Sequence, residues 1–474
     1  MNPSRQLPLL IPLLLAVVFP AYAEQDCARL RPQEVVACHV AKIRDAPLDF
    51  RLLATEPGPG YVLQRYQMNS QVWLPTPVVE PTVWRHPVDI YVPTNAQPGT
   101  ALLVVNNSPA LHDADYSPEA LAEVARQTAR VVVMIADVPD QPITFSDVEQ
   151  PLLEDHAVAH TWATVLRDPA AAPELPLHVP MAAAASRAMD LAERTLSALA
   201  IKHFVITGAS KRGWSAWLTA MADERVMAIV PGVIDVADTS EMLAGLRKRY
   251  GGSWPVALWP YQQAGVLQQV GSPGFEGLMA MMDPMAYASE PGQRLAMPKY
   301  LVSASGDDSF APDPITDYQQ RLPGQTSLRV LPNSDHAGVR QAVASTLVPA
   351  LRRLSEGQPL PRVQVQSSGQ AGHTTVEFSE PPVAVKMWTA SNDKDRDFRY
   401  ACGVRYRSQT LKPMQRMSVE RTAPASGWQA QFIEAVFADG FIATSPVSVL
   451  PETFPEHPPA EQPGACRTFP AESR

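Results

Sequence analysis

Apolar runs alternate with amphipathic segments over the middle of this chain. Four short runs are rich in apolar and β-branched residues, as is typical of strands buried on both faces: 101–105, 130–135, 204–207 and 226–230. Helical patterns separate or follow them, at about 153–167, 181–199 and 337–355. Alternating strands of this kind form a parallel sheet that helices cover on both faces, and the strand-like residues 61–93 lead into it.

The pattern changes after residue 357. Residues 355–361 have the composition of a linker, and from 363 to 450 apolar and polar residues alternate in short runs. Several short strands with turn residues between them predict an immunoglobulin-like β-sandwich. We therefore expect an α/β domain at 24–357, a β-sandwich module at 363–450 and a Pro-rich tail at 451–474.

The first 23 residues have the pattern of a signal peptide. Arg5 is followed by an apolar stretch at 7–19 and by Ala21-Tyr22-Ala23, a sequence that signal peptidases cleave. The mature chain would begin near Glu24 and would contain no membrane span. This predicts a protein that is exported, either to the periplasm or out of the cell.

Four cysteines and the charge balance refine this picture. Cys27, Cys38, Cys402 and Cys466 predict two disulfides in an oxidising compartment. Three pairings are possible, and local pairing of the first two and of the last two is the simplest. The formal net charge is −9 without a basic run, so we expect no nucleic-acid partner.

The most informative motif is Gly208-Ala209-Ser210-Lys211-Arg212-Gly213, between a β-branched run and an apolar helical run. A serine on a tight strand-to-helix turn is how α/β-hydrolases present a nucleophile. Asp307 and Asp308 follow the next apolar strand, and His336 follows the one after it. Serine, acid and histidine in this order, each after a strand, predict a catalytic triad of Ser210, one of the two aspartates, and His336.

Other residues are candidates for binding the substrate. The backbone N–H of Lys211 and one N–H from Asn107 or Ser108 would form the oxyanion hole. Arg212 would contact the substrate or form a surface ion pair. A lid-like insertion at 235–297 carries aromatic residues that would line the cleft or form a small core of their own: Trp254, Trp259 and Tyr261.

A metal site is not expected. His156 and His160 lie four residues apart on a predicted helix, as zinc ligands often do. The metalloprotease pattern requires Glu directly after the first histidine, and Ala157 stands there instead. We predict neither a metal nor an organic cofactor.

Several short motifs elsewhere in the chain accompany 207–214: Glu154-Asp155 with Thr161-Trp162, Pro180-Met181 with Arg187-Ala188-Met189-Asp190, Tyr250-Gly251-Gly252, Asp283-Pro284 with Tyr287, Met297-Pro298-Lys299, and Pro332-Asn333 with Asp335-His336. Together they resemble the PhoPQ-activated pathogenicity-related proteins, which are exported bacterial proteins of α/β-hydrolase type. The resemblance covers most of the mature chain. The family pattern Gly-Asp-Glu-Phe-Phe is similar to Gly306–Phe310 and favours Asp307 over Asp308. The resemblance also implies a link to virulence and to resistance against antimicrobial peptides.

These patterns predict an exported serine hydrolase that cleaves an ester or amide bond in a small-molecule or peptide substrate. Two alternatives stay open. The serine motif with Arg212 also resembles that of glucuronoyl esterases, which favours a carbohydrate ester. A binding protein that keeps the fold without catalysis would have the same patterns.

Overall fold

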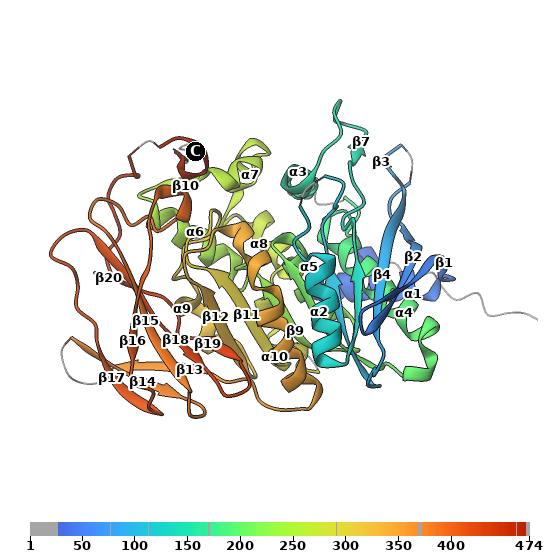
Figure 1. Ribbon diagram of the computed structural model, residues 1–474. Helices are drawn as coiled ribbons and strands as arrows, with labels where there is room; N and C mark the ends of the chain where they lie inside the picture. The colour runs from blue at the N-terminus through green and yellow to red at the C-terminus, as the bar shows by residue number, and fades with distance from the viewer. Residues whose placement is uncertain are drawn as a thin grey trace, which may run out of the picture.

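A nine-stranded mixed sheet forms the centre of the computed structural model (Figure 1). The structure describes residues 27–75, 77–111, 113–168, 171–290, 292–367, 372–460 and 462–470, and the predicted signal peptide lies outside them. The strands lie in the order β1 (Asp49–Gly58), β2 (Tyr61–Val72), β4 (Val83–Pro93), β6 (Val131–Ile135), β5 (Thr100–Val105), β8 (His203–Ala209), β9 (Val226–Gly232), β11 (Lys299–Ala304) and β12 (Thr326–Leu331). The pairs from β1 to β6 are antiparallel, and those from β6 to β12 are parallel.

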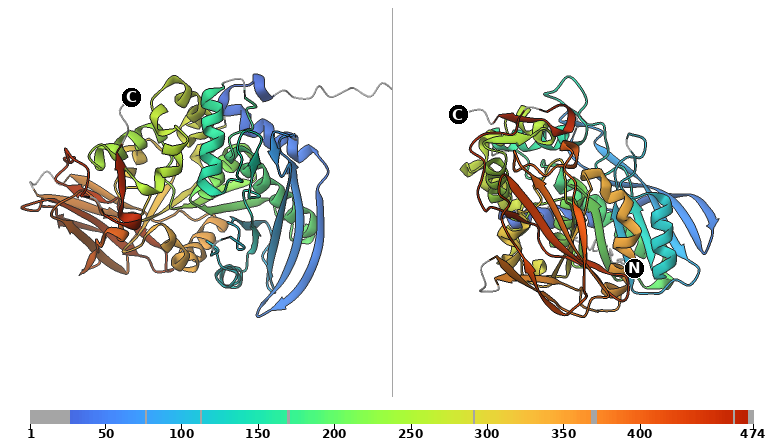
Figure 2. Two further views of the ribbon diagram at one scale, coloured as in Figure 1. Left: turned by 90° about the horizontal axis from the view of Figure 1, so that it is seen from above. Right: turned by 60° about the vertical axis from the view of Figure 1, so that its left-hand side comes forward.

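Helices cover both faces of this sheet, as the apolar runs predict. One face carries α1 (Pro32–Asp45), α4 (His178–Thr195) and α5 (Lys211–Ala222), and the other carries α2 (Pro118–Thr128) and α10 (Val343–Ser355) (Figure 2). Successive strand residues alternate between the two cores: Leu103 and Ile206 pack on the first side, Leu102 and Val205 on the second. Both cores are therefore built from the same strands, which explains why the strands are apolar throughout.

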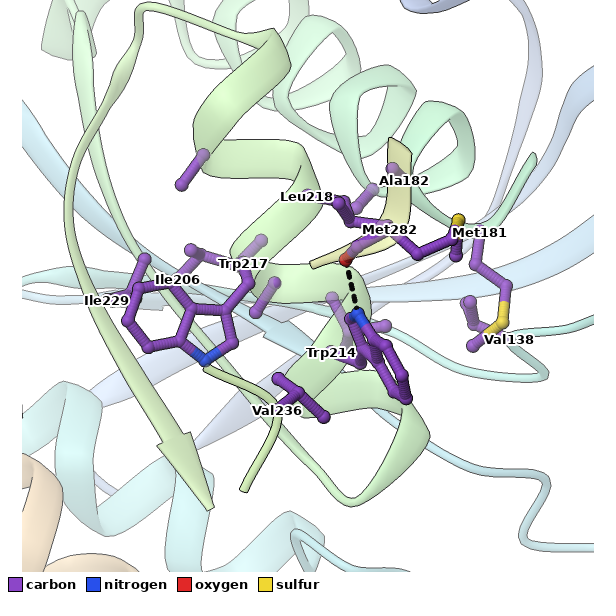
Figure 3. Packing of buried hydrophobic residues seen from close by; sticks show 14 of the residues in the cluster. Val138, Met181, Ala182, Ile206, Trp214, Trp217, Leu218, Ile229, Val236 and Met282 are labelled. Atoms are coloured by element: carbon purple, nitrogen blue, oxygen red, sulfur yellow. Dashed lines mark hydrogen bonds between the residues drawn. The ribbon is translucent and has the colours of Figure 1, made fainter. Parts of the chain in front are cut away.

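The helix that follows the serine motif is anchored in the first core. Trp214 and Trp217 of α5 are buried, and the indole N–H of Trp214 donates to the Met282 carbonyl at 2.7 Å (Figure 3). Met282 ends α8 (Pro273–Met282), which belongs to the insertion. The hydrogen bond thus joins the serine-bearing helix to the segment between β9 and β11.

The insertion is mostly helical and lies at the carboxyl edge of the sheet. It contains α6 (Thr239–Arg249), β10 (Ser253–Pro255), α7 (Trp259–Gln263), α8, and the 3-10 turns η3 (Val256–Leu258), η4 (Leu267–Gln269), η5 (Pro284–Tyr287) and η6 (Arg294–Ala296). The helix α3 (Glu154–Arg167) packs against α7 and α8 of the insertion. Short strands β3 (Val79–Glu80) and β7 (Thr144–Phe145) pair beside it.

The C-terminal region forms antiparallel sheets, as predicted. One consists of β13 (Val363–Ser367), β14 (His373–Phe378) and β17 (Arg416–Glu420); the other consists of β16 (Arg407–Leu411), β15 (Ala384–Asn392), β18 (Trp428–Val436), β19 (Ile442–Thr444) and β20 (Ser448–Leu450). The first, second and fifth strands share one sheet, and the third, fourth and sixth share the other. Side chains from both sheets share one apolar core, as in immunoglobulin-like sandwiches.

The tail returns from this module to the insertion. Its strand β21 (Thr468–Pro470) pairs antiparallel with β10. The disulfides join Cys27 to Cys38 and Cys402 to Cys466, which confirms the local pairing. No helix in the described part of the chain combines the length and apolarity that a membrane crossing requires.

We expect Trp214→Phe to lower the free energy of unfolding by about 1–3 kcal/mol, because the Met282 carbonyl would stay buried without its donor. The matched control is Trp388→Phe, since the Trp388 indole nitrogen is buried without a hydrogen-bond partner among the described residues. Urea unfolding at pH 7 would measure both variants. Equal losses of stability would show that the hydrogen bond contributes little.

Candidate active site

The serine motif forms a sharp turn between β8 and α5. Ser210 has φ 55° and ψ −129°, a conformation that costs energy for a residue other than glycine. Its N–H donates to the Gly232 carbonyl at 2.9 Å, and its carbonyl accepts from the Trp214 N–H at 3.0 Å. The neighbouring strand and the first helical turn therefore hold the serine in this strained geometry.

The two glycines of the motif make this turn possible. A Cβ on Gly208 would lie 2.5 Å from the Arg212 carbonyl oxygen, so only glycine fits there. A Cβ on Gly213 would lie 2.8 Å from the Ile234 side chain and 2.9 Å from the Gly208 carbonyl oxygen. Glycine is thus required at positions 208 and 213, where helix and strand approach closely. At position 212 only the backbone carbonyl takes part in this approach, so a side chain is tolerated there.

The loops after β11 and β12 bring an aspartate and a histidine together. His336 Nδ1 lies 2.9 Å from Oδ2 and 3.0 Å from Oδ1 of Asp307. The Asp307 carboxylate is buried and also accepts the backbone N–H groups of Ser309 and Phe310, at 2.8 and 3.2 Å. These bonds fix the carboxylate in place. Because Nδ1 contacts Asp307, Nε2 is the ring nitrogen that remains for a proton transfer.

The environments of the two neighbouring aspartates differ. Burial lowers the pKa of His336, but the charge of Asp307 and its hydrogen bond outweigh burial, so the pKa lies above its ordinary value. Asp308 has Oδ1 buried without a hydrogen-bond partner in the described structure. Burial, and then the nearby charge of Asp307, raises the pKa of Asp308 to about 6. Asp307 therefore contacts the imidazole, whereas Asp308 faces the adjoining cavity.

This cavity has a volume of about 430 Å³ and contains the elements of a hydrolase site. Ser210, His336 and Asp308 line it together with Tyr261 of the insertion. The other lining residues are Asn107, Asp115, Glu154, Asp155, Ala209, Lys211, Arg212, Val233, Ala257, Leu258, Ser309, Ala337 and Arg340. Most of these side chains are polar or charged, so the cavity fits a polar group of a substrate.

Trp254 and Trp259, the other two aromatic residues that were predicted to line the cleft, lie outside the cavity wall. Trp254 is buried in β10, where it pairs with Phe469 of the tail. Trp259 is 41% exposed and contacts the Phe469 ring edge-on, with centroids 5.2 Å apart. These two residues therefore attach the tail to the insertion, and Tyr261 alone of the three reaches the cavity.

A buried ion-pair cluster lies beside the serine. Glu154 Oε2 accepts from Lys211 Nζ at 2.7 Å, and Oε1 accepts from Arg212 Nη2 at 2.7 Å. Asp155 lies 3.2 Å from the same Lys211 nitrogen and accepts the Tyr261 hydroxyl at 3.1 Å. Arg212 is thus a buried residue whose Nε also donates to the Val138 carbonyl, not a surface ion pair.

These pairs determine the charge states of the cluster. Burial raises the pKa of the Glu154 carboxyl, but Lys211 and Arg212 outweigh burial and hold it well below its usual range. Burial lowers the pKa of Lys211, and Asp155 and Glu154 reverse that effect. Glu154 has φ 48°, so its backbone is strained as well. No sequence pattern predicted this role for Glu154 and Asp155, although both belong to the motif Glu154-Asp155 with Thr161-Trp162.

Asn107 and Ser108 follow β5 near the serine. The Asn107 amide donates to the Asp113 carbonyl and accepts the Asp115 N–H, at 2.9 and 3.0 Å. The Asn107 side chain is therefore hydrogen-bonded within the loop, and its backbone N–H is the group that could donate to an oxyanion in the cavity. Ser108 is buried and is not among the lining residues.

The histidine pair on α3 is divided between two environments. His156 is exposed, whereas His160 Nε2 lies 3.1 Å from Asp147 Oδ1 and packs on the Phe145 ring. Among the described residues, the potential metal-binding group that the structure brings together is Asp397 with Cys402 and Cys466, and these cysteines are joined in a disulfide. Sulfur atoms in a disulfide lack the thiolate charge that binds metals.

The mixed sheet and the strained serine after its central parallel strand define a protein of the α/β-hydrolase fold. The chain belongs to the PhoPQ-activated pathogenicity-related protein family, whose sequence model matches residues 36–399. The match ends inside the C-terminal module, just after β15.

Individual relatives extend this comparison. The chain is 29% identical to autocrine proliferation repressor protein A of Dictyostelium discoideum, over 84% of this chain and 86% of that protein. An acetyl xylan esterase from Paenibacillus sp. R4 has 15% identity and a TM-score of 0.47, over 68% of this chain and 94% of its own. A glucuronoyl esterase from Solibacter usitatus has 14% identity and a TM-score of 0.35, over 65% of this chain and 90% of its own.

We expect Glu154→Gln to lower the free energy of unfolding by about 3 kcal/mol, because two buried cations would lose their shared counter-charge. Asp155→Asn is the matched control: its side chain is 36% exposed, and its loss should cost less than about 1 kcal/mol. Chemical denaturation of both variants would test this, and similar losses would contradict it.

Proposed function

We propose that this protein is a serine hydrolase in which Ser210 is the nucleophile, His336 the general base and Asp307 the orienting acid. The observation that carries the proposal is the contact of His336 Nδ1 with both carboxylate oxygens of a buried Asp307, beside a cavity that Ser210 with its strained backbone also lines. Strain at a non-glycine residue persists where the surrounding structure maintains it, and active sites are common places for it.

The chemical steps follow from these contacts. His336 accepts the Ser210 proton on Nε2 as the Ser210 oxygen attacks the carbonyl carbon of the substrate. Asp307 holds the imidazole by Nδ1–H and stabilises its charged form. The imidazolium then protonates the leaving group, an acyl-enzyme forms, and water activated by His336 hydrolyses it.

The negative oxygen of the tetrahedral intermediate needs N–H donors. The Lys211 N–H lies at the start of α5, where the first N–H groups of a helix have no intrahelical acceptor. The Asn107 backbone N–H would be the second donor, since its side chain is occupied within the loop. The salt bridge of Lys211 with Glu154 would fix the first donor in place.

The substrate carries an ester or amide bond, and the polar cavity favours a small molecule or a short peptide segment over a long acyl chain. We also propose that the chain is exported, because the two disulfides need an oxidising compartment. No feature of the described cavity specifies a carbohydrate ester, so that alternative enters the experiments as one substrate among several.

We expect a fluorophosphonate probe to label the wild-type protein covalently and not the Ser210→Ala variant. Intact-protein mass spectrometry would detect the adduct, and a panel of aryl esters, peptides and a glucuronate methyl ester would then identify the bond that is cleaved. Ser215→Ala is the control, since Ser215 lies on the same helix but its hydroxyl bonds to the Lys211 carbonyl. Equal labelling of wild type and Ser210→Ala would refute the proposed nucleophile, and no labelling of either would favour a silent binding protein.

The neighbouring aspartates should differ in their effect on catalysis. We expect Asp307→Asn to reduce kcat by about four orders of magnitude, because the imidazole would lose its orienting charge. Asp308→Asn should retain most of the activity, since Asp307 would still hold the imidazole. Comparable losses in both variants would contradict the assignment of Asp307. Asp313, the next aspartate along the chain, is paired with Arg249 and Arg396 and therefore has a structural role.

The pH profile should report the same contact. His336 acts only when neutral, so activity falls as pH decreases through its pKa, which lies above the ordinary value in wild type. Without the Asp307 charge, burial alone would lower that pKa. We therefore expect the acidic limb of kcat/KM to move to lower pH in Asp307→Asn, measured on the residual activity.

A further inference from the structure

We propose that residues 400–406 of the C-terminal module form a bracket that positions the two loops carrying Asp307 and His336, so that this module is part of the catalytic unit. The inference rests on the proposed function for its effect on turnover. It goes beyond that function, because it assigns a role to a region that carries none of the triad residues.

The bracket first contacts the acid loop. The Tyr400 N–H donates to the Gly306 carbonyl at 2.9 Å, directly before Asp307. A Cβ on Gly306 would lie 2.5 Å from the Tyr400 nitrogen, so the two backbones approach as closely as glycine allows. The Gly306 N–H donates to the Ser334 carbonyl at 2.9 Å, which joins the acid loop to the histidine loop.

The bracket then contacts the histidine loop through Asn333. Asn333 Nδ2 donates to the Tyr406 carbonyl at 2.9 Å, and Oδ1 accepts the Tyr406 N–H at 2.6 Å. Asn333 has φ 55°, a left-handed conformation that asparagine tolerates better than most residues. Its own N–H donates to the Ser305 hydroxyl at 2.9 Å, so one residue connects both loops to the bracket three positions before His336.

The bracket is itself held rigidly at its centre. Cys402 is joined to Cys466 of the tail, and the buried Arg399 donates to the carbonyls of Ala465, Cys466 and Arg467 at 3.0, 2.7 and 3.1 Å. Asp397 pairs with the same guanidinium at 2.6 Å. The disulfide and this arginine thus fix the bracket to the tail.

The tail continues the connection to the cavity wall. The Val256 N–H donates to the Arg467 carbonyl at 3.0 Å, next to the pairing of β10 with β21. Ala257 and Leu258, which follow Val256, line the cavity. One disulfide-linked unit of the C-terminal region therefore touches the acid loop, the histidine loop and the wall of the insertion.

This arrangement matters because catalysis is sensitive to small displacements. Misplacing a reacting group by about 1 Å can cost on the order of a hundredfold in rate. Asp307 and His336 extend from separate loops at neighbouring strand ends, and the bracket bonds to both from one side. Residues 400–406 do not line the cavity, so they are positioning residues and do not contact the substrate.

The first test is Asn333→Gly in the full-length protein. Glycine keeps the positive φ but removes both hydrogen bonds to Tyr406. We expect kcat to fall by about tenfold to a hundredfold with KM changed by less than threefold, because positioning and not binding is lost. A kcat within twofold of wild type in a folded variant would overturn the proposal.

The two disulfides provide a matched pair for the second test. Cys402→Ala/Cys466→Ala removes the disulfide that holds the bracket to the tail. Cys27→Ala/Cys38→Ala removes the disulfide that joins the segment before α1 to the middle of that helix. Assayed well below their unfolding temperatures, the first variant should lose kcat as Asn333→Gly does and the second should not. Equal effects of the two would show that the disulfides act only through stability.

An NMR titration of His336 separates failure of this proposal from failure of the proposed function. The charged groups around His336 are Asp307, Asp308, Asp155 and Lys211, and Asn333→Gly changes none of them. A loosened contact with Asp307 would lower the His336 pKa in the substrate-free protein, whether or not the protein hydrolyses anything. An unchanged titration would overturn the bracket, whereas a shifted titration in a protein without hydrolase activity would overturn only the proposed function.

Discussion

The reversal of the chain at Ser210 is the constraint on which the rest of the site depends. Ser210 has a positive φ, which is unfavourable for a residue with a side chain, so contacts with the surrounding residues must stabilise the turn. Gly208 and Gly213 allow the close approach of strand and helix, and the Gly232 carbonyl accepts the serine N–H. Trp214 then anchors the helix to the insertion through Met282.

The ion-pair cluster extends this constraint to the cavity. Lys211 and Arg212 directly follow the serine, and each needs a buried counter-charge because an isolated charge in the interior is costly. Glu154, at the start of α3, supplies it to both. The charges therefore fix α3 against α5, and Asp155 with Tyr261 connects the insertion to the same cluster.

The C-terminal region adds a third layer of support. An immunoglobulin-like module could be a separate unit joined by a linker, yet residues 400–406 bond to both loops that end β11 and β12. The tail pairs with the insertion, and a disulfide and Arg399 hold it to the module. Sheet, insertion and module thus meet at the edge where the candidate triad lies.

The amino-acid sequence determined what depends on short-range order. Apolar runs specified strands buried on both faces, the glycines around Ser210 specified a tight turn, and the short spacing of Cys27 and Cys38 favoured their pairing. Only the tertiary structure decided which of two adjacent aspartates contacts His336. Long-range packing fixes the loop that carries both, so that Asp307 meets the imidazole and Asp308 lines the cavity. The same holds for Tyr261, which reaches the cavity, and for Trp254 and Trp259, which contact a tail some two hundred residues away. The ion pairs of Glu154 and the hydrogen bonds between Asn333 and the bracket likewise join segments that are distant in the chain, and no local pattern encodes such contacts.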